Sequence, residues 1–304
     1  MPASARNLVT TVIDAERCIG CGRCIPVCPS DTLSMVDGKA VVTGPTSLQC
    51  GHCAAVCPTD AIRVTALDDR MQRFDTFRLD PAWLPHGQGD LPGLVRLMAS
   101  RRSCRNYRDA PVDRAMLDDL VRIACTAPSG TNCQPWSFTV LPDRAAVMRL
   151  GDGMLGFFDK LNRIAANPLI RKADKWFGKG MLDAYNRDYR ERVQQGIDDY
   201  RAGGRDRLFH GAPAAIVVAQ LPGATTGIED ALLAAQNLLL GAHAMGLGTC
   251  LIGFGVEAMT RDPSIQARIG IPRHEKVRAV IAVGWPDERY KSVAGRRAAP
   301  VRWS

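Results

Sequence analysis

The sequence predicts a two-part α+β protein, in which a small cysteine-rich module of short strands precedes a larger domain of alternating helices and strands. Three observations support this fold class. Seven of the eleven cysteines lie close together near the N-terminus, the following stretch is rich in Pro and Gly without a hydrophobic period, and helical spacing of apolar residues begins after it. We therefore expect one domain at residues 1–66, a linker at residues 67–92 and a second domain at residues 93–304.

Short β-strands are expected around the cysteines of the first domain, at residues 10–14 and 40–43. In the second domain, apolar and β-branched runs bounded by Pro or Gly predict further strands at residues 137–141, 214–220 and 277–283. Such runs are typical of strands that are buried on both faces. A sandwich with a central sheet and flanking helices is therefore predicted.

Two helices of the second domain are clearly indicated. Asp113 is a suitable N-cap for the first, which presents one apolar face. The residues of that face are Leu117, Leu120, Val121 and Ala124. Residues 229–247 are almost wholly apolar and rich in Ala and Leu, so we expect this second helix in the core or at a dimer interface.

Basic and acidic side chains balance within the first domain. The formal net charge of +8 therefore arises in the rest of the chain. A basic excess can attract nucleic acid, but no helix-turn-helix, zinc-finger or aromatic RNA-binding pattern accompanies it. We expect it to attract an anionic cofactor or substrate instead. The sequence has no run of about 18 apolar residues and no signal-peptide core near its start, so we expect a cytoplasmic protein without nucleic-acid or membrane partners.

The clustered cysteines form two runs. The first follows the spacing C-x2-C-x2-C-x3-C-P, the run of bacterial ferredoxins with two 4Fe-4S clusters, in which three thiolates bind one cube and the fourth reaches the other. The second run repeats this spacing and ending, which makes a zinc site with its four ligands a poor explanation. The first run is Cys18, Cys21, Cys24 and Cys28 with Pro29, and the second is Cys50, Cys53 and Cys57 with Pro58.

Crossed ligation divides these cysteines between two clusters. One 4Fe-4S cluster receives Cys18, Cys21, Cys24 and Cys57. The other receives Cys28, Cys50 and Cys53 and is one thiolate short, because Ser47 stands where the repeat requires a cysteine. A serine alkoxide can ligate iron but needs a far larger pKa reduction than a thiol. The second cluster is therefore expected to be either 4Fe-4S with an oxygen or exogenous ligand, or 3Fe-4S.

Three further stretches carry a resemblance to a known family. They read RRSCRNY at residues 101–107, APSGTNCQPW at residues 127–136 and GLGTCLIG at residues 246–253. In this order they resemble the nitroreductase family of FMN enzymes, of which a subset carries a two-cluster ferredoxin at the N-terminus. The resemblance thus covers nearly the whole chain. It implies a domain-intertwined homodimer with FMN at the subunit interface.

The resemblance also assigns residues to the cofactor. The phosphate and ribityl chain of FMN would be held by Arg101, Arg102, Ser103 and Arg105. The flavin of the partner subunit would be reached by Pro128, Ser129, Gly130 and Asn132. Backbone amides near flavin N5 would come from Leu251, Ile252 and Gly253. Arg296 and Arg297 look like C-terminal phosphate ligands, although their spacing departs from the family pattern.

The expected function is reduction of a small electron-poor substrate, such as a nitro compound, a quinone or an activated alkene, by reduced FMN. Electrons would enter through the clusters from a donor protein, or as hydride from NAD(P)H, and no side chain is named as proton donor. A helical insert at residues 156–207 is placed to cover the substrate or simply packs on the domain. The alternative is an electron carrier or redox sensor that exchanges electrons with a protein partner and turns over no small substrate.

Overall fold

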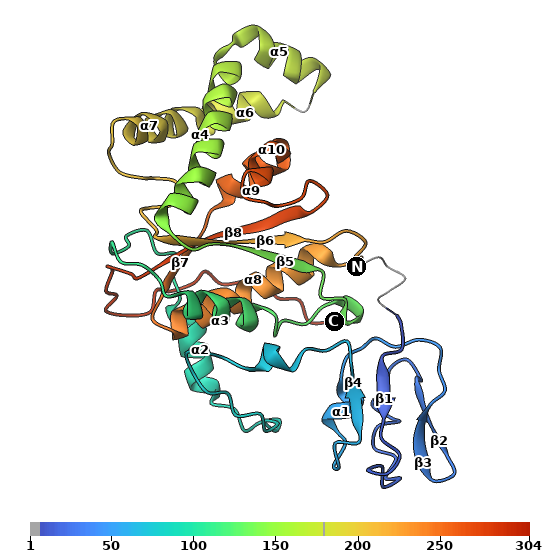
Figure 1. Ribbon diagram of the computed structural model, residues 1–304. Helices are drawn as coiled ribbons and strands as arrows, with labels where there is room; N and C mark the ends of the chain where they lie inside the picture. Colours follow the sequence, from blue (N-terminus) through green and yellow to red (C-terminus); the bar gives the residue numbers. More distant parts are fainter. Residues whose placement is uncertain (1–6, 179) are drawn as a thin grey trace.

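Two small antiparallel sheets form the first part of the chain in the computed structural model, which describes residues 7–178 and 180–304 (Figure 1). β1 pairs with β4, and β2 pairs with β3. The elements are β1 (Thr11–Ile13), β2 (Leu33–Val36), β3 (Lys39–Val42), α1 (His52–Ala55) and β4 (Ile62–Val64). β1 and β3 confirm the two strands expected around the cysteines, and Ala40 and Ile62 pack with Cys18 and Cys53 in a small core.

A four-stranded antiparallel sheet in the order β5-β6-β8-β7 lies at the centre of the larger part (Figure 1). Its strands are β5 (Trp136–Leu141), β6 (Ala214–Gln220), β7 (Gly248–Leu251) and β8 (Lys276–Gly284). The three predicted strands are therefore confirmed as β5, β6 and β8. The short edge strand β7 carries too few apolar residues to be predicted. Alternate residues of β6 point to opposite faces, so Ile216 and Val217 belong to two different core clusters.

Helices cover both faces of this sheet. α3 and α8 pack together on one face, while α4, α9 and α10 cover the other. Their bounds are α3 (Arg114–Ala124), α4 (Arg144–Ala166), α8 (Gly227–Ala244), α9 (Gly253–Arg261) and α10 (Pro263–Ala267). The predicted face of α3 holds, since Leu117, Leu120 and Ala124 are almost fully buried. None of the helices in the described ranges is long and apolar enough to cross a lipid bilayer.

A helical extension projects from the sheet on the α4 side (Figure 1). After α4 it consists of α5 (Pro168–Phe177), α6 (Met181–Asp188) and α7 (Arg190–Arg201). α7 turns back and packs along α4. α4 runs without interruption from Arg144 through Gly156, so the insert expected at residues 156–207 starts inside this helix.

The connection between the two parts is held in place by a buried carboxylate of α3. Residues 68–90 contain only one short 3-10 helix, η2 (Asp69–Gln72), and α2 (Leu91–Ser100) follows them. Asp119, which is 0% exposed, accepts hydrogen bonds from the amides of Asp75 (3.0 Å) and Thr76 (2.8 Å) and from the Thr76 hydroxyl (2.7 Å). Arg122 donates to the same carboxylate at 2.7 Å. The connection is thus anchored at one point along its length.

Candidate cofactor sites

The first hollow of the cysteine-rich part is lined by four thiols. These are Cys18, Cys21, Cys24 and Cys57. The loop that presents three of them turns at Gly20, which has φ +73°, and a Cβ there would lie 2.1 Å from the carbonyl oxygen of Gly38. Only glycine fits this approach. The amide of Ala61 donates to the Cys57 sulfur at 3.3 Å, as amides do around iron-sulfur clusters.

A second hollow is lined by the remaining three thiols of the two runs together with Ser47. These thiols are Cys28, Cys50 and Cys53. Ser47 is buried, and its hydroxyl accepts a hydrogen bond from the Gln49 amide at 3.0 Å. The structure therefore groups the eight side chains as crossed ligation expects. Within the described ranges, no three His, Cys, Asp or Glu side chains meet at a site for one metal ion, whereas each thiol group surrounds a hollow.

Several of the thiols are set up to ligate as thiolates. Backbone hydrogen bonds from Ala40 and Gly20 lower the pKa of Cys18. Burial raises the pKa of Cys28 and Cys57, but hydrogen bonds from Thr32 and Thr59 outweigh it, so the pKa of both thiols is lowered. Burial raises the pKa of Cys24 and Cys53 instead. It also raises the pKa of scattered cysteines outside the two runs. Burial raises the pKa of Cys104 to about 12 and that of Cys125 to about 11, as expected for thiols without redox chemistry.

We predict that Ser47→Cys completes the second ligand set. Iron is expected to rise from about seven to about eight atoms per chain, and the EPR signal of an oxidised 3Fe-4S cluster to disappear. Ser47→Ala offers no ligating atom and is expected to leave iron at about seven. Iron and acid-labile sulfide assays with low-temperature EPR check both variants. The opposite pattern, with eight irons in the parent protein and a loss only in Ser47→Ala, would show that the serine already ligates iron.

A cluster of arginines lies at the start of β7. Burial lowers the pKa of Arg101, and the nearby charges of Arg102 and Arg296 lower it further. In the described chain no carboxylate forms an ion pair with any of the three. Such a cluster repels itself until an anion joins it, so these residues fit a phosphate group. Arg297, by contrast, lies on the exposed C-terminal segment without a contact that ties it to the cluster.

The segment that carries these arginines is fixed to the sheet by its backbone. Ser103 forms a parallel bridge with Thr249 of β7, and the amide of Cys104 donates to the Thr249 carbonyl at 2.8 Å. The Arg105 amide donates to Glu288 at 3.0 Å. Burial raises the pKa of Cys250, and the nearby Arg105 and Ser103 oppose this shift. The donors predicted for the cofactor phosphate are therefore presented along one edge of the sheet.

The loop at residues 128–134 is held by a buried acid of α8. Asp230 accepts the amide of Gly130 at 3.0 Å, and the Ser129 hydroxyl accepts the amide of Gln134 at 3.0 Å. The side-chain amide of Asn132 donates to the carbonyl of Gln49 at 3.0 Å. Because residue 49 precedes Cys50, this loop contacts the first domain beside the second hollow. The side chain of Asn132 is thus directed to the first domain.

The segment at the end of β7 turns directly into α9. The amide of Ile252 donates to Val280 at 2.8 Å, so it is used within the sheet. Leu251 is 52% exposed, and Gly253 begins α9. At a helix start the first amides have no partner within the helix, so those of Gly253 and Phe254 are the donors this segment offers.

Comparison with known proteins decides the family. The model of the nitroreductase family matches residues 98–285, more than half of the chain. The chain belongs to the nitroreductase family. A second model, of 4Fe-4S binding domains, matches residues 11–34, so this nitroreductase-family oxidoreductase carries an iron-sulfur domain at its N-terminal side.

Similar proteins agree with this assignment. A 4-nitrobenzoate reductase from Nocardioides is 29% identical over 64% of this chain and 81% of its own length. An NADH dehydrogenase from Thermus thermophilus is 29% identical over 62% of this chain and 84% of its own. A crystal structure of a nitroreductase with bound FMN from Desulfitobacterium hafniense covers 68% of this chain and 97% of its own, with 20% identity and a TM-score of 0.50. That likeness shows the fold alone.

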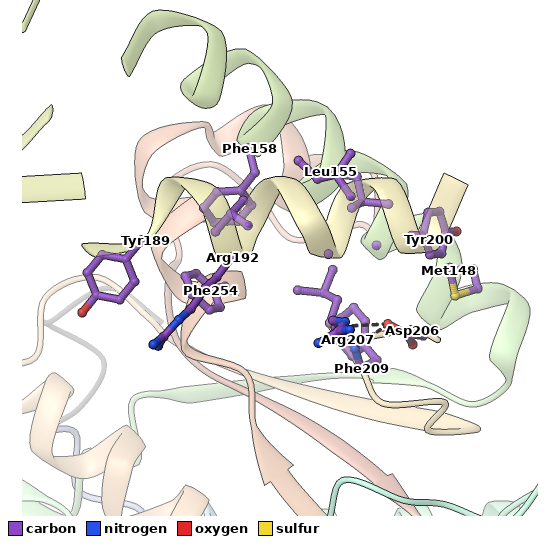
Figure 2. Close-up of a pocket in the computed structure, with 15 residues that line it drawn as sticks. Met148, Leu155, Phe158, Tyr189, Arg192, Tyr200, Asp206, Arg207, Phe209 and Phe254 are labelled. Carbon is purple, nitrogen blue, oxygen red and sulfur yellow. Dashed lines mark hydrogen bonds between the residues drawn. The ribbon is translucent and has the colours of Figure 1, made fainter. Parts of the chain in front are cut away.

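The nitroreductase domain also contains a cavity of about 330 Å³ between α4, α7 and α9 (Figure 2). The sequence showed only that aromatic residues occur in this helical segment. Glu288 and Asp230, which hold two of the segments that the sequence assigns to the cofactor, were not named as site residues. The two acids at the start of the otherwise apolar α8, Glu229 and Asp230, were a usable signal for Asp230, because a carboxylate that is buried with such a helix requires donors. Glu288 carried no comparable signal.

Proposed function

We propose that this chain is an iron-sulfur flavoprotein in which electrons pass from two clusters to FMN and then to a small electron-poor substrate. One contact carries the proposal. The hydrogen bond from Asn132 to Gln49 joins the loop assigned to the flavin with the residue before Cys50 of the second hollow. The second cluster would thus lie nearer the flavin, and the cluster of the first hollow would receive electrons first.

FMN suits the cation cluster of this chain. Arg101, Arg102 and Arg296 offer positive charge to a phosphate, and Ser103 and the free amides at the start of α9 offer further donors. When bound, FMN would transfer hydride or electrons to a nitro compound, a quinone or an activated alkene. The 4-nitrobenzoate reductase among the similar proteins supports a nitro compound. Either a donor protein or NAD(P)H would supply the electrons.

The exposed apolar side chains of two helices support the proposal of a homodimer. α8 exposes Ile228, Leu232 and Leu233. α2 exposes Leu91, Leu94, Val95 and Met98. Apolar faces of this kind are typical of subunit interfaces. In the proposed intertwined dimer the loop at residues 128–132 would reach the flavin of the partner subunit. Within each chain, we propose that the first domain ends at residue 66 and the second begins at residue 93.

The cavity beside α9 favours an enzyme over an electron carrier, because a carrier needs no enclosed space for a small molecule. The test is to purify the protein without oxygen and assay FMN and iron. The reduced protein is then mixed with a nitroaromatic compound while cluster and flavin spectra are followed. About one FMN per chain and substrate-dependent reoxidation of both spectra are expected. A protein without flavin, or reduced clusters that never reduce the flavin, would contradict the proposal.

Asn132→Ala is expected to slow cluster-to-flavin electron transfer by about 2- to 10-fold, since one hydrogen bond contributes about 0.5–1.5 kcal/mol to the docked arrangement. Stopped-flow mixing with a low-potential donor measures this rate. Thr131→Ala is the control, because the Thr131 hydroxyl donates only to Gly130 of its own loop. Equal rates in both variants and the parent would show that this contact does not set the route.

A further inference from the structure

The cavity between α4 and α7 has the size and the walls of a site for one aromatic ring. Its volume is about 330 Å³. An apolar cavity of about 150 Å³ accommodates benzene, so this one accommodates a ring with substituents. Leu155 and Phe158 of α4, Val193 and Ile197 of α7 and Phe254 of α9 form its apolar walls. Phe158 and Phe254 meet edge to face with ring centroids 5.5 Å apart.

Most of the polar groups that line the cavity are already paired. Asp206 forms an ion pair with Arg144 at 2.8 Å, Arg207 pairs with Asp199, and the Tyr200 hydroxyl donates to Asp152 at 3.0 Å. Of the described charged side chains that line the cavity, Arg192 is the one without a hydrogen bond or an ion pair. Figure 2 shows its guanidinium at the end of the cavity where Tyr189 and Phe254 lie.

We propose that this cavity binds an aromatic anion, with the ring against Phe158 and Phe254 and a carboxylate at Arg192. The inference rests on the proposed function, because it names the class of substrate. Phe254 directly follows Gly253, so a ring in the cavity lies next to the segment assigned to the flavin. The arginine thereby selects an anionic ring over a neutral one of the same shape.

The selectivity has a definite physical origin. A neutral ring fills the apolar space but leaves Arg192 to water, whereas a carboxylate pairs with the guanidinium and accepts two parallel hydrogen bonds. Fully exposed ion pairs contribute little because water screens them, and an ion pair at the edge of an apolar cavity is less screened. A preference of about 5- to 10-fold for the anion is therefore expected.

The test compares 4-nitrobenzoate with its neutral counterpart 4-nitrobenzamide on the full-length, flavin-loaded, oxidised protein, by equilibrium dialysis. The parent is expected to bind the acid about 5- to 10-fold more tightly. Arg192→Gln is expected to abolish the preference. Arg149→Gln, which removes an exposed and unpaired arginine from the neighbouring α4, is expected to retain it. Equal binding of the two compounds by the parent, or an unchanged preference in Arg192→Gln, would overturn the inference.

A second variant tests the position of the ring. A Cβ on Gly151, which lines the cavity, would make only ordinary contacts of 3.6 Å or more, and leucine is favoured over glycine in a helix. Gly151→Leu is thus expected to fold and to weaken binding of both compounds, and unchanged binding would place the ligand elsewhere and overturn the site. If the protein bound the acid preferentially but did not reduce its nitro group, the proposed function would be refuted and the binding site would stand. If it reduced both compounds without a preference for the acid, the proposed function would stand and the anion site would be refuted.

Discussion

Arg101→Gln is expected to weaken FMN binding by about 100-fold and to leave the flavin-free protein at least as stable as the parent. A charge-assisted hydrogen bond contributes about 1.5–3 kcal/mol, and the upper part of that range corresponds to about 100-fold in affinity. Arg101 is partly buried at the centre of the cation cluster, so few other side chains can replace its contact with a phosphate.

The expected effect on stability has the opposite sign. Burial and the neighbouring charges of Arg102 and Arg296 lower the pKa of Arg101 below its unfolded value, which means that folding disfavours the cation. A neutral glutamine carries no charge and therefore removes this unfavourable contribution to the free energy of folding. A bound phosphate reverses the sign, because it pairs with the cation and contributes stability only when present.

FMN fluorescence titration measures the affinity, and thermal unfolding followed by circular dichroism measures the stability of the flavin-free protein. Arg273→Gln serves as control, since Arg273 is an exposed arginine outside the cluster. It is expected to change neither quantity. If Arg101→Gln clearly lowered the melting temperature of the flavin-free protein, its weaker FMN binding would reflect a role of Arg101 in folding and not at the phosphate.

Local patterns in the sequence predicted the parts of the fold that local physics determines. β6 and the part of β8 from Ala279 onward are buried on both faces and are apolar there, which makes them visible as runs. α3 shows a face at helical spacing because only one side of it is buried. The start expected for the helical insert lies inside α4, because the three glycines of this helix interrupt its pattern without ending it.

Contacts between distant residues could not be predicted in this way. Glu288 accepts the amide of Arg105 across 183 positions of sequence, and Asn132 reaches Gln49 across 83. No spacing rule connects such pairs, since only the folded sheet and the connection between the domains bring them together. The cysteines were an exception. Their spacing is fixed by the size of a cluster, so the two groups of side chains could be proposed before the hollows were seen.

Asp119→Asn is expected to release the connection between the domains at a cost of about 3 kcal/mol. Breaking a buried charged hydrogen-bond network typically destabilises by about 3–5 kcal/mol, and Arg122 here keeps a second partner in Asp75 at 2.8 Å. The amides of Asp75 and Thr76 lose their anionic acceptor. Asp118→Asn is the matched control, because Asp118 forms only an exposed pair with Arg114 at 3.6 Å and is expected to change stability by less than about 1 kcal/mol.

The same network predicts a dependence on pH. Burial raises the pKa of Asp119, but the hydrogen bonds from Asp75, Thr76 and Arg122 outweigh it and hold the pKa below its usual value. A lowered folded pKa means that the contribution is complete above the unfolded pKa of about 3.9 and is lost as the pH falls through the folded value. Urea unfolding and hydrogen exchange at residues 75–76 are expected to separate the parent from Asp119→Asn at pH 7. The difference is expected to begin to shrink below about pH 4 and to vanish only when the pH has fallen through the lowered folded pKa. A difference that stayed constant across this range would mean that the side chain acts by its shape and not by its charge.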